Sequence, residues 1–412
     1  MASHSIRFLQ DAEADIEKIR KDNNTWSSGV SAESMVRTAI DTAQDWAIGA
    51  RNNLVAIRSG ADRVDDQLSV QKARWDNSVG KAFRLFFGWD FDDGAKHIDK
   101  VDTRLRKLHD RIDGGLTVKC RPGSGFRSGK CDDSTAFQRF GWFAGDNINL
   151  CPIWFGKDAD YRAAVIAHEV LHAIGGFGTV DLKNDRGQTV YGTPLALLFA
   201  QDEPTNARRN AENYEQFFTY RARHFTLPRT GVSGWTGVPE KPDAACMHPN
   251  GNAYFFKENK YYRFVPGSGV DKVGRIGVDG WGGLPTHLDA AVEHPNGAVY
   301  FFKGDKYYRY KFNPDNMDKV GRIGIDGWSG VKHPVQAAFR HPDTGDAWFF
   351  RDLHCQRFDF GPDKTTQGGV IHDRFPQLYG YVDTALFYPP QDKLYVFVTD
   401  RYTRISRGSL PR

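Results

Sequence analysis

Two stretches near the N-terminus have the hydrophobic spacing of amphipathic helices. Apolar residues recur every three or four positions, which places them on one face of a helix. The first stretch carries Val36, Ile40, Ala43, Ala47, Ala50, Leu54 and Ile57, and the second carries Ile98, Val101, Leu105, Leu108 and Ile112. Most such stripes pack into a core, so we expect core packing here. For the first helix, a pro-segment and a partner-binding element are the alternatives.

The C-terminal half of the chain repeats at intervals of 46, 47 and 47 residues. The units begin at Asp243, Asp289, Gln336 and Asp383. Each unit continues with an aromatic strand and then a strand that ends on a basic residue: Arg263, Arg309, Arg357 and Arg404. An aromatic residue stands eight positions before each unit: Trp235, Trp281, Trp328 and Phe375. A fixed period of this length predicts stacked supersecondary units.

The letters of the repeat distinguish between propeller families. WD40 blades would show GH and WD dipeptides, and kelch repeats are longer. The D-A-A start, the YFFK and YYR strands and the closing W-x-G resemble hemopexin repeats. This resemblance implies a four-bladed propeller that binds a macromolecular target, with a structural ion in its central channel. His248, His294 and His341 each precede proline, so we expect turn residues rather than haem ligands.

The end of the chain suggests how the propeller closes. The sequence stops soon after Arg404, before any outer element with a tryptophan, whereas the segment around Trp235 precedes the first unit. We therefore expect residues 231–238 to complete the last blade and to close the ring by strand pairing.

A third helical pattern, RAAVIAHEVLHAI at 162–174, contains the motif HExxH, and Gly175-Gly176 follows as a helix stop. His168 and His172 stand one turn apart on the same face, so both imidazoles can bind one metal ion. Glu169 is placed to polarise a water molecule on that metal. Buried helices also carry this motif without a metal, and catalytic zinc requires a third protein ligand.

Several residues are candidates for the third ligand. The pattern HExxHxxGxxH would place a histidine at position 178, which is glycine. Asp181, nine residues after His172, is the nearest alternative. Glutamates of a later helical stretch are further candidates: Glu203, Glu212 and Glu215.

The segment after the HExxH motif resembles a known family. GTVD at 178–181, followed by Tyr191-Gly192, is similar to the G-T-x-D-x-x-Y-G element of the aspzincins, the deuterolysin and peptidyl-Lys metalloendopeptidase family. CDDSTAF at 131–137, INLCPIWF at 148–155 and NAENYEQF at 210–217 resemble further motifs of that family. The chain departs from the family where LKNDRGQTV separates Asp181 from Tyr191 in place of two residues.

The resemblance implies a zinc peptidase with the ligands His168, His172 and Asp181. Glu169 would be the general base, and Tyr191, or in second place Tyr214, would donate a hydrogen bond to the oxyanion. Glu212 occupies the position at which an acidic residue of the family favours lysine after the scissile bond. The alternative, to which we give equal weight, is a solvated carboxylate on the helix surface.

Composition limits the other function classes. The 412 residues carry a net charge of +4, with 26% charged residues, so no general attraction to nucleic acid follows. No stretch approaches the ~20 apolar residues of a membrane helix. The N-terminus lacks the apolar core of a signal peptide. We expect either a mature secreted protein or one that is delivered outside the cell by another route.

The five cysteines favour an oxidising destination only weakly. Cys120, Cys131 and Cys151 lie in the peptidase-like segment, where the resembling family forms disulfides. The sequence does not say which two pair, and reduced buried thiols are the alternative. Cys246 and Cys355 each lie inside a repeat and are not expected to pair.

The sequence thus predicts a multidomain α+β protein. A helical segment at 1–75 precedes a helical zincin-type metallopeptidase domain at 76–226, a linker and closing strand at 227–240, and an all-β, four-bladed hemopexin-like propeller at 241–412. The favoured function is a zinc endopeptidase whose propeller binds a protein target, which also fits a secreted toxin. The alternative is a binding protein with a vestigial or latent peptidase domain.

Overall fold

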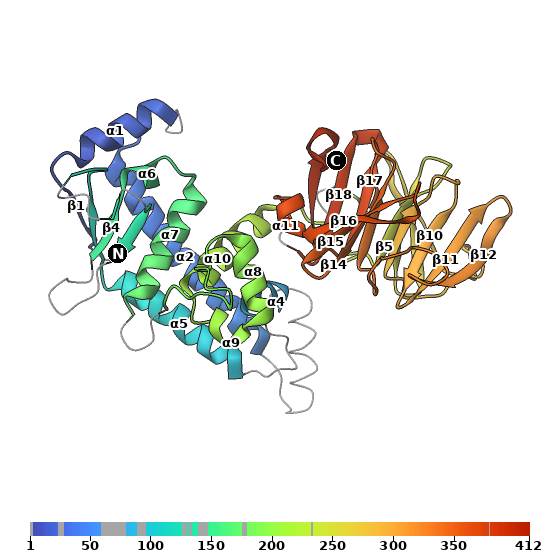
Figure 1. Cartoon of the computed structure of the whole chain (residues 1–412), viewed down its shortest axis with the longest axis horizontal. Helices are drawn as coiled ribbons and strands as arrows, with labels where there is room; N and C mark the ends of the chain where they lie inside the picture. The colour runs from blue at the N-terminus through green and yellow to red at the C-terminus, as the bar shows by residue number, and fades with distance from the viewer. Residues whose placement is uncertain are drawn as a thin grey trace. The chain divides into compact units, whose positions relative to one another are not determined.

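The computed structural model describes residues 3–23, 29–58, 80–88, 96–125, 130–131, 134–138, 147–174, 179–231, 234–378 and 380–412. The chain divides into two compact units, Met1–Phe225 and Thr226–Arg412 (Figure 1). The predicted domain boundary after residue 75 and the predicted helix stop at Gly175-Gly176 lie outside the described residues. Among the described helices, none has the length and hydropathy of a membrane span.

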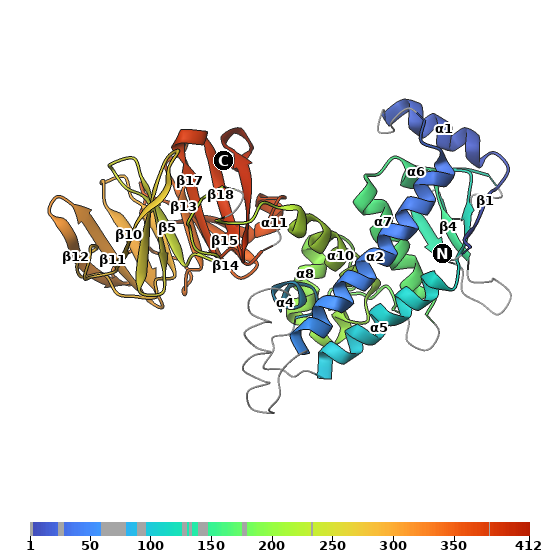
Figure 2. The ribbon, with the colours of Figure 1, turned by 180° about the vertical axis from the view of Figure 1, so that it is seen from behind.

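Three long helices form the frame of the first unit (Figures 1 and 2). Helix α2 (Ala32–Arg58) packs against α5 (Lys96–Asp113) and α7 (Ala159–His172). The described side chains of both predicted apolar stripes are buried, so both stripes are core packing. The remaining helices are α1 (Ala12–Asn23), α4 (Gly80–Phe87), α6 (Pro152–Phe155), α8 (Thr193–Asp202), α9 (Pro204–Ala207) and α10 (Ala211–Thr226).

A four-stranded sheet completes the first unit. Its order is β1 (Ser5–Phe8), β2 (Thr117–Cys120), β4 (Asn147–Leu150) and β3 (Ala136–Gln138). The first two pairs are parallel, whereas β3 lies antiparallel at the edge. The predicted helical segment at 1–75 contains α1 and α2, and it also contributes β1, a strand that the sequence pattern did not predict. A strand of four residues without flanking turn signals is too short to be recognised from its hydrophobic alternation.

A disulfide between Cys131 and Cys151 joins the segment before β3 to the residue that follows β4. Cys120 stays a buried thiol, and burial raises its pKa to about 12. Cys246 and Cys355 are buried and free, as predicted. Spacing alone left the pairing open because it depends on how the sheet folds.

The second unit consists of four antiparallel sheets, each built from one sequence repeat. The first blade contains β5 (Ala244–Met247), β6 (Ala253–Lys257), β7 (Lys260–Val265) and β8 (Gly269–Arg275). The second contains β9 (Ala290–Glu293), β10 (Val299–Lys303), β11 (Lys306–Phe312) and β12 (Asp315–Arg322). The third contains β13 (Ala337–Arg340), β14 (Ala347–Arg351), β15 (His354–Asp359) and β16 (Lys364–Val370), and the short α11 (Ile371–Arg374) follows it. The fourth has three strands, β17 (Thr384–Tyr388), β18 (Lys393–Val398) and β19 (Arg401–Ser406).

The residue that opens each repeat fixes a turn in its own blade. The side-chain oxygen of Asp243 accepts a hydrogen bond of 2.6 Å from the backbone N–H of Glu258, in the turn between β6 and β7. Asp289, Gln336 and Asp383 make the equivalent bond in the other blades, at 2.6, 2.7 and 2.6 Å. The recurring acid is therefore a structural acceptor, and the amide of Gln336 can replace it.

The aromatic residue before each repeat fills the space between two blades. Trp281 packs between the first and second blades, Trp328 between the second and third, and Phe375 between the third and fourth. Trp235 has the same role between the fourth and first blades, where it contacts Phe255 and Phe397. Trp235 therefore closes the ring by packing.

The prediction that residues 231–238 pair with the last blade is wrong in position. Pairing occurs earlier, at Arg229, which forms an antiparallel bridge with Arg401 of β19. The backbone N–H of Thr230 donates to Asp400 O at 2.9 Å, and that of Tyr402 donates to Pro228 O at 3.1 Å. Trp235 itself lies in the core between the fourth and first blades instead of along the strand.

His248, His294 and His341 are turn residues, as predicted. His248 Nδ1 accepts a hydrogen bond from the backbone N–H of Asn250 at 3.0 Å. His294 and His341 accept equivalent bonds from Asn296 and Asp343, both at 3.1 Å. Their ring nitrogens thus stabilise hairpins.

We expect loss of the disulfide to destabilise the first unit. The variant with both Cys131→Ser and Cys151→Ser should lose about 3 kcal/mol in free energy of unfolding, because the cross-link restricts the unfolded chain. Urea unfolding measures this loss. A reductant should lower the stability of the wild type by a similar amount and leave the double variant unchanged; equal stability of both proteins would contradict the prediction.

We expect Trp235→Ala to destabilise the propeller by about 3–5 kcal/mol, because the substitution leaves a cavity where the ring closes. Trp235 is 5% exposed. Thermal unfolding of the full-length protein measures the effect. Val278→Ala is the control, since Val278 is 66% exposed and its truncation should change stability by at most about 0.5 kcal/mol. Equal melting temperatures for both variants would rule out closure by Trp235.

Candidate active site

Helix α7 positions the HExxH motif. Asp158 caps the helix, since its carboxylate accepts the backbone N–H of Tyr161 at 2.8 Å. The apolar run from Ala163 to Ala167 is buried and fixes the helix in the core. The rings of His168 and His172 lie on one face, with centroids 4.8 Å apart. The predicted spacing thus gives two neighbouring imidazoles.

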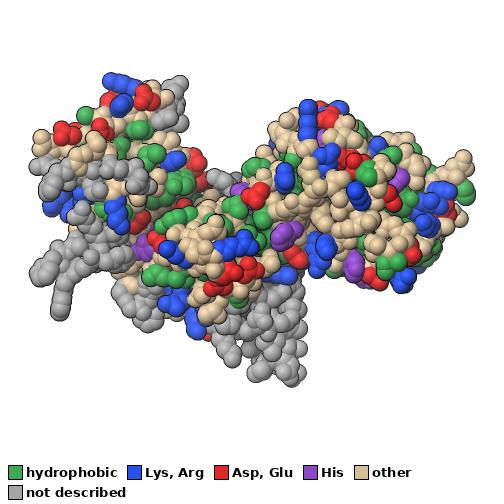
Figure 3. Space-filling view, in the orientation of Figure 1, with side chains coloured by type: hydrophobic (Ala, Val, Ile, Leu, Met, Phe, Trp, Pro, Cys, Tyr) green, Lys and Arg blue, Asp and Glu red, His purple; other side chains and the backbone are tan. Residues whose placement is uncertain are grey.

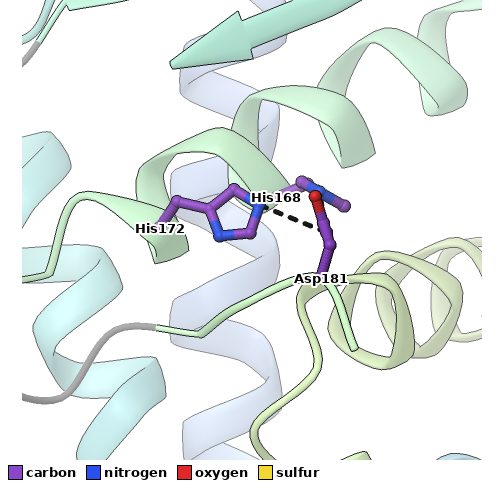
Figure 4. A group of neighbouring side chains, drawn as sticks. All are labelled: His168, His172 and Asp181. Carbon is purple, nitrogen blue, oxygen red and sulfur yellow. Dashed lines mark ion pairs between the residues drawn. The ribbon is translucent and has the colours of Figure 1, made fainter. Parts of the chain in front are cut away.

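Asp181 completes a group of three possible metal ligands (Figure 4). Its Oδ1 atom lies 3.3 Å from His168 Nε2 and 3.4 Å from His172 Nε2. Burial opposes ionisation of Asp181, but the two imidazoles hold the pKa of its carboxyl well below the usual range. Two nitrogens and a carboxylate oxygen facing one point match the donor set of a catalytic zinc site.

The other nitrogen of each imidazole also lies close to an oxygen atom. His172 Nδ1 lies 2.9 Å from the backbone oxygen of Thr179, and His168 Nδ1 lies 2.9 Å from Glu215 Oε2. Metal-binding histidines commonly use such contacts to fix the ring orientation. Burial lowers the pKa of His168, but the carboxylates of Asp181 and Glu215 together raise it well above its usual value. Glu215 is thus placed to orient His168.

A cavity of about 640 Å³ surrounds this group. Glu169 lines the cavity, is 7% exposed, and has its pKa raised by burial. Tyr191 also lines it, and its hydroxyl donates a hydrogen bond of 2.9 Å to Asp181 Oδ2. Both residues therefore lie in the same cavity as the possible metal ligands.

The insertion between Asp181 and Tyr191 folds back on itself. Lys183 and Thr189 form an antiparallel bridge, and the backbone N–H of Val190 donates to Leu182 O at 2.9 Å. This small hairpin returns the chain to its starting point. The insertion therefore leaves the Tyr191 hydroxyl beside Asp181.

Two glutamates of α10 form an acidic wall of the cavity. Glu212 and Glu215 are 4% and 6% exposed. Glu212 Oε1 accepts hydrogen bonds from the backbone N–H of Gly192 at 2.9 Å and from Nε2 of Gln216 at 2.8 Å. Burial, followed by the charge of Glu215, raises the pKa of Glu212 to about 7. The alternative of a solvated surface carboxylate is therefore wrong for Glu212.

Two other candidates lie away from the cavity. Tyr214 is fully buried, its ring packs against Phe87, and its hydroxyl donates to Arg208 O at 3.0 Å. The prediction that Tyr214 could bind the substrate by donating a hydrogen bond to its oxyanion is wrong, because two positions separate Tyr214 from Glu212 and place it on the opposite face of α10. Glu203 lies at the end of α8, where it accepts a hydrogen bond from Asn206.

Sequence reasoning missed part of the cavity wall. Tyr161 lines the cavity from α7, and Thr135, Ala136 and Phe137 line it from β3 and the segment before it. Tyr161 stands two helical turns before His168, so helical spacing contained the signal. The strand contained none, because its position beside α7 depends on the sheet.

Comparisons with known proteins agree with this architecture. Residues 72–219 match the family model of lysine-specific metallo-endopeptidases, the aspzincins. Residues 242–286 and 288–331 match the hemopexin repeat. No curated protein sequence matches the chain.

Two solved structures with similarity to the chain each cover less than half of it. The hemopexin fold protein CP4 from cow pea is 19% identical, with a TM-score of 0.37, over 41% of this chain and 87% of that protein. The zinc peptidase from Grifola frondosa is 16% identical, with a TM-score of 0.33, over 47% of this chain and 98% of that enzyme. The chain thus combines a segment, residues 72–219, that matches the aspzincin metallopeptidase family with a four-bladed propeller whose first two blades match the hemopexin repeat.

Proposed function

We propose that this protein is a zinc-dependent endopeptidase, with His168, His172 and Asp181 as the metal ligands. The observation that carries the proposal is the approach of both Nε2 atoms to Asp181 Oδ1, at 3.3 and 3.4 Å, in the cavity that also contains Glu169. The donor types fit zinc. Thr179 O and Glu215 Oε2 lie beside the Nδ1 atoms of His172 and His168, where such contacts fix the orientation of metal-binding imidazoles.

In the proposed peptide hydrolysis, the metal ion, Glu169 and Tyr191 have separate roles. A bound zinc ion supplies a Lewis acid that acidifies water and polarises a carbonyl group. The Glu169 carboxylate accepts a proton from the attacking water and delivers it to the leaving amine. The Tyr191 hydroxyl donates a hydrogen bond to the oxyanion that develops on the substrate carbonyl. The hydrogen bond from the Tyr191 hydroxyl to Asp181 Oδ2 holds this hydroxyl beside the proposed metal ligands.

The edge of the sheet is suited to bind the substrate backbone. Strand β3 lies at the end of the described sheet, and its residues Ala136 and Phe137 line the cavity. An extended peptide can pair with such an edge through main-chain hydrogen bonds. The proposal thus favours an unfolded or loop segment of a protein as the substrate.

The acidic wall favours lysine next to the scissile bond. Glu212 and Glu215 are both buried in the cavity, and their mutual repulsion raises the pKa of Glu212 beyond the effect of burial. The ammonium group of a substrate lysine would relieve this repulsion and pair with both carboxylates. An apolar substrate side chain would supply no positive charge to offset this repulsion.

We assign the propeller the role of binding or anchoring a protein target. On the face seen in Figure 3, Lys and Arg side chains are interspersed with Asp and Glu, consistent with the net charge of +4. Such a surface does not favour nucleic acid as the partner. A structural ion in the central channel remains part of the proposal, and the Cys131–Cys151 disulfide supports a destination outside the cell.

We expect Glu169→Gln to lower peptide cleavage by about 10²–10⁴-fold, because the amide cannot accept the proton of water. The zinc content should stay unchanged, since Glu169 is not one of the three ligands. Mass spectrometry of the fragments of an unfolded protein measures cleavage, with and without a chelator. Full activity in the variant would contradict the role of Glu169. A folded, zinc-loaded wild type without cleavage would instead favour a binding protein or a latent enzyme.

We expect Glu212→Gln to weaken the preference for lysine. Loss of a hydrogen bond between charged groups, worth about 1.5–3 kcal/mol, should lower kcat/KM for lysine substrates about 10–100-fold relative to glutamine substrates. Steady-state kinetics on paired peptides measures this ratio. Glu203→Gln is the matched control, because Glu203 does not line the cavity. An unchanged ratio in Glu212→Gln would exclude Glu212 as a specificity residue.

A further inference from the structure

The sequence NAEN at 210–213 contains two asparagines with no role in the proposed chemistry. Asn210 nevertheless contacts the segment that carries Asp181. Its Oδ1 atom accepts the backbone N–H of Leu182 at 2.9 Å. The backbone N–H of Val180 donates to Arg209 O at 2.9 Å, and that of Ala211 donates to Val180 O at 3.2 Å. The residues on both sides of Asp181 are therefore attached to the start of α10.

Asn213 anchors Asn210 to the core. Asn210 Nδ2 donates to Asn213 Oδ1 at 2.7 Å. Asn213 Nδ2 donates to Phe86 O of α4 at 2.8 Å and to Ala196 O of α8 at 2.9 Å. Both asparagines are fully buried. A buried and well-satisfied polar network of this kind favours one arrangement of the elements that it joins.

Asp181 needs such an anchor more than the other two ligands do. His168 and His172 are fixed by a buried helix, whereas Asp181 lies outside regular structure and its side chain is 34% exposed. The hairpin from Leu182 to Val190 follows it directly and returns Tyr191 to its hydroxyl contact. Movement at Leu182 would therefore displace both Asp181 and Tyr191.

We propose that Asn210 and Asn213 are positioning residues that hold Asp181 in place for the metal ion. The inference rests on the proposed zinc site and adds the parts that support its third ligand. Asn210 acts directly through Leu182 and the Val180 backbone, and Asn213 acts through Asn210.

Zinc affinity of the full-length protein tests the proposal. Competition with a chromophoric chelator measures the affinity, and thermal unfolding of the metal-free protein measures stability in parallel. Asn210→Ala should bind zinc about 10–100-fold more weakly than the wild type. Asn213→Ala should lose less affinity, and the double variant should lose no more than Asn210→Ala alone, because the two residues act in series.

Asn149→Ala is the matched control. Asn149 is also buried, at 1% exposure, and its Nδ2 atom donates to Phe137 O and Asn147 O at 3.1 and 3.2 Å. This control should lose stability but keep the zinc affinity of the wild type. If Asn210→Ala does not fold, Asn210→Ser replaces it, because the serine side chain is too short to reach both the backbone N–H of Leu182 and the side chain of Asn213.

The outcomes separate the two proposals. Wild-type zinc affinity in a folded Asn210 variant, or equal losses in the Asn210 and Asn149 variants, would overturn the positioning role alone. A folded wild type that binds no zinc would overturn the metal site itself, and the positioning role with it. A selective loss in the Asn210 variant supports both.

Discussion

The candidate active site depends on the pairing of two short segments, Val180 on one side and Arg209 to Ala211 on the other. Helix α7 brings His168 and His172 to one face, because their spacing matches one helical turn. Asp181, the third candidate ligand, has no such local support. The backbone bonds of Val180 to Arg209 and Ala211 place Asp181 opposite the two imidazoles. The hydroxyl contact of Tyr191 and the side-chain contact of Asn210 depend on the same pairing.

Helix α10 links several features of the site. It contributes Glu212 and Glu215 to the cavity, brings Glu215 within 2.9 Å of His168 Nδ1, and carries Asn213 in its buried network. One helix thus positions the acidic wall, lies beside a histidine of the HExxH motif and supports the loop of Asp181. A displacement of α10 would alter the cavity and the candidate metal site together.

The propeller follows a different principle, in which one local rule is repeated four times. An acceptor at the start of each repeat fixes a turn of the same blade, and an aromatic residue fills the junction with the neighbouring blade. The fourth junction uses Trp235, which precedes the first repeat in sequence. Residues near the two ends of the unit thereby pack together, and this contact makes the ring a closed structure.

Features that depend on near neighbours along the chain were predictable from the amino-acid pattern. Helical spacing predicted the pair His168 and His172, the period predicted four blades, and the His-Pro dipeptides predicted turns. The tertiary structure decided the features that join distant segments. It paired Cys131 with Cys151, brought Glu215 to His168, buried Tyr214 in the core, moved the closing pair to Arg229 and added β1 to the sheet. Periodicity reports which residues share a face of one element, whereas contacts between elements depend on how those faces pack.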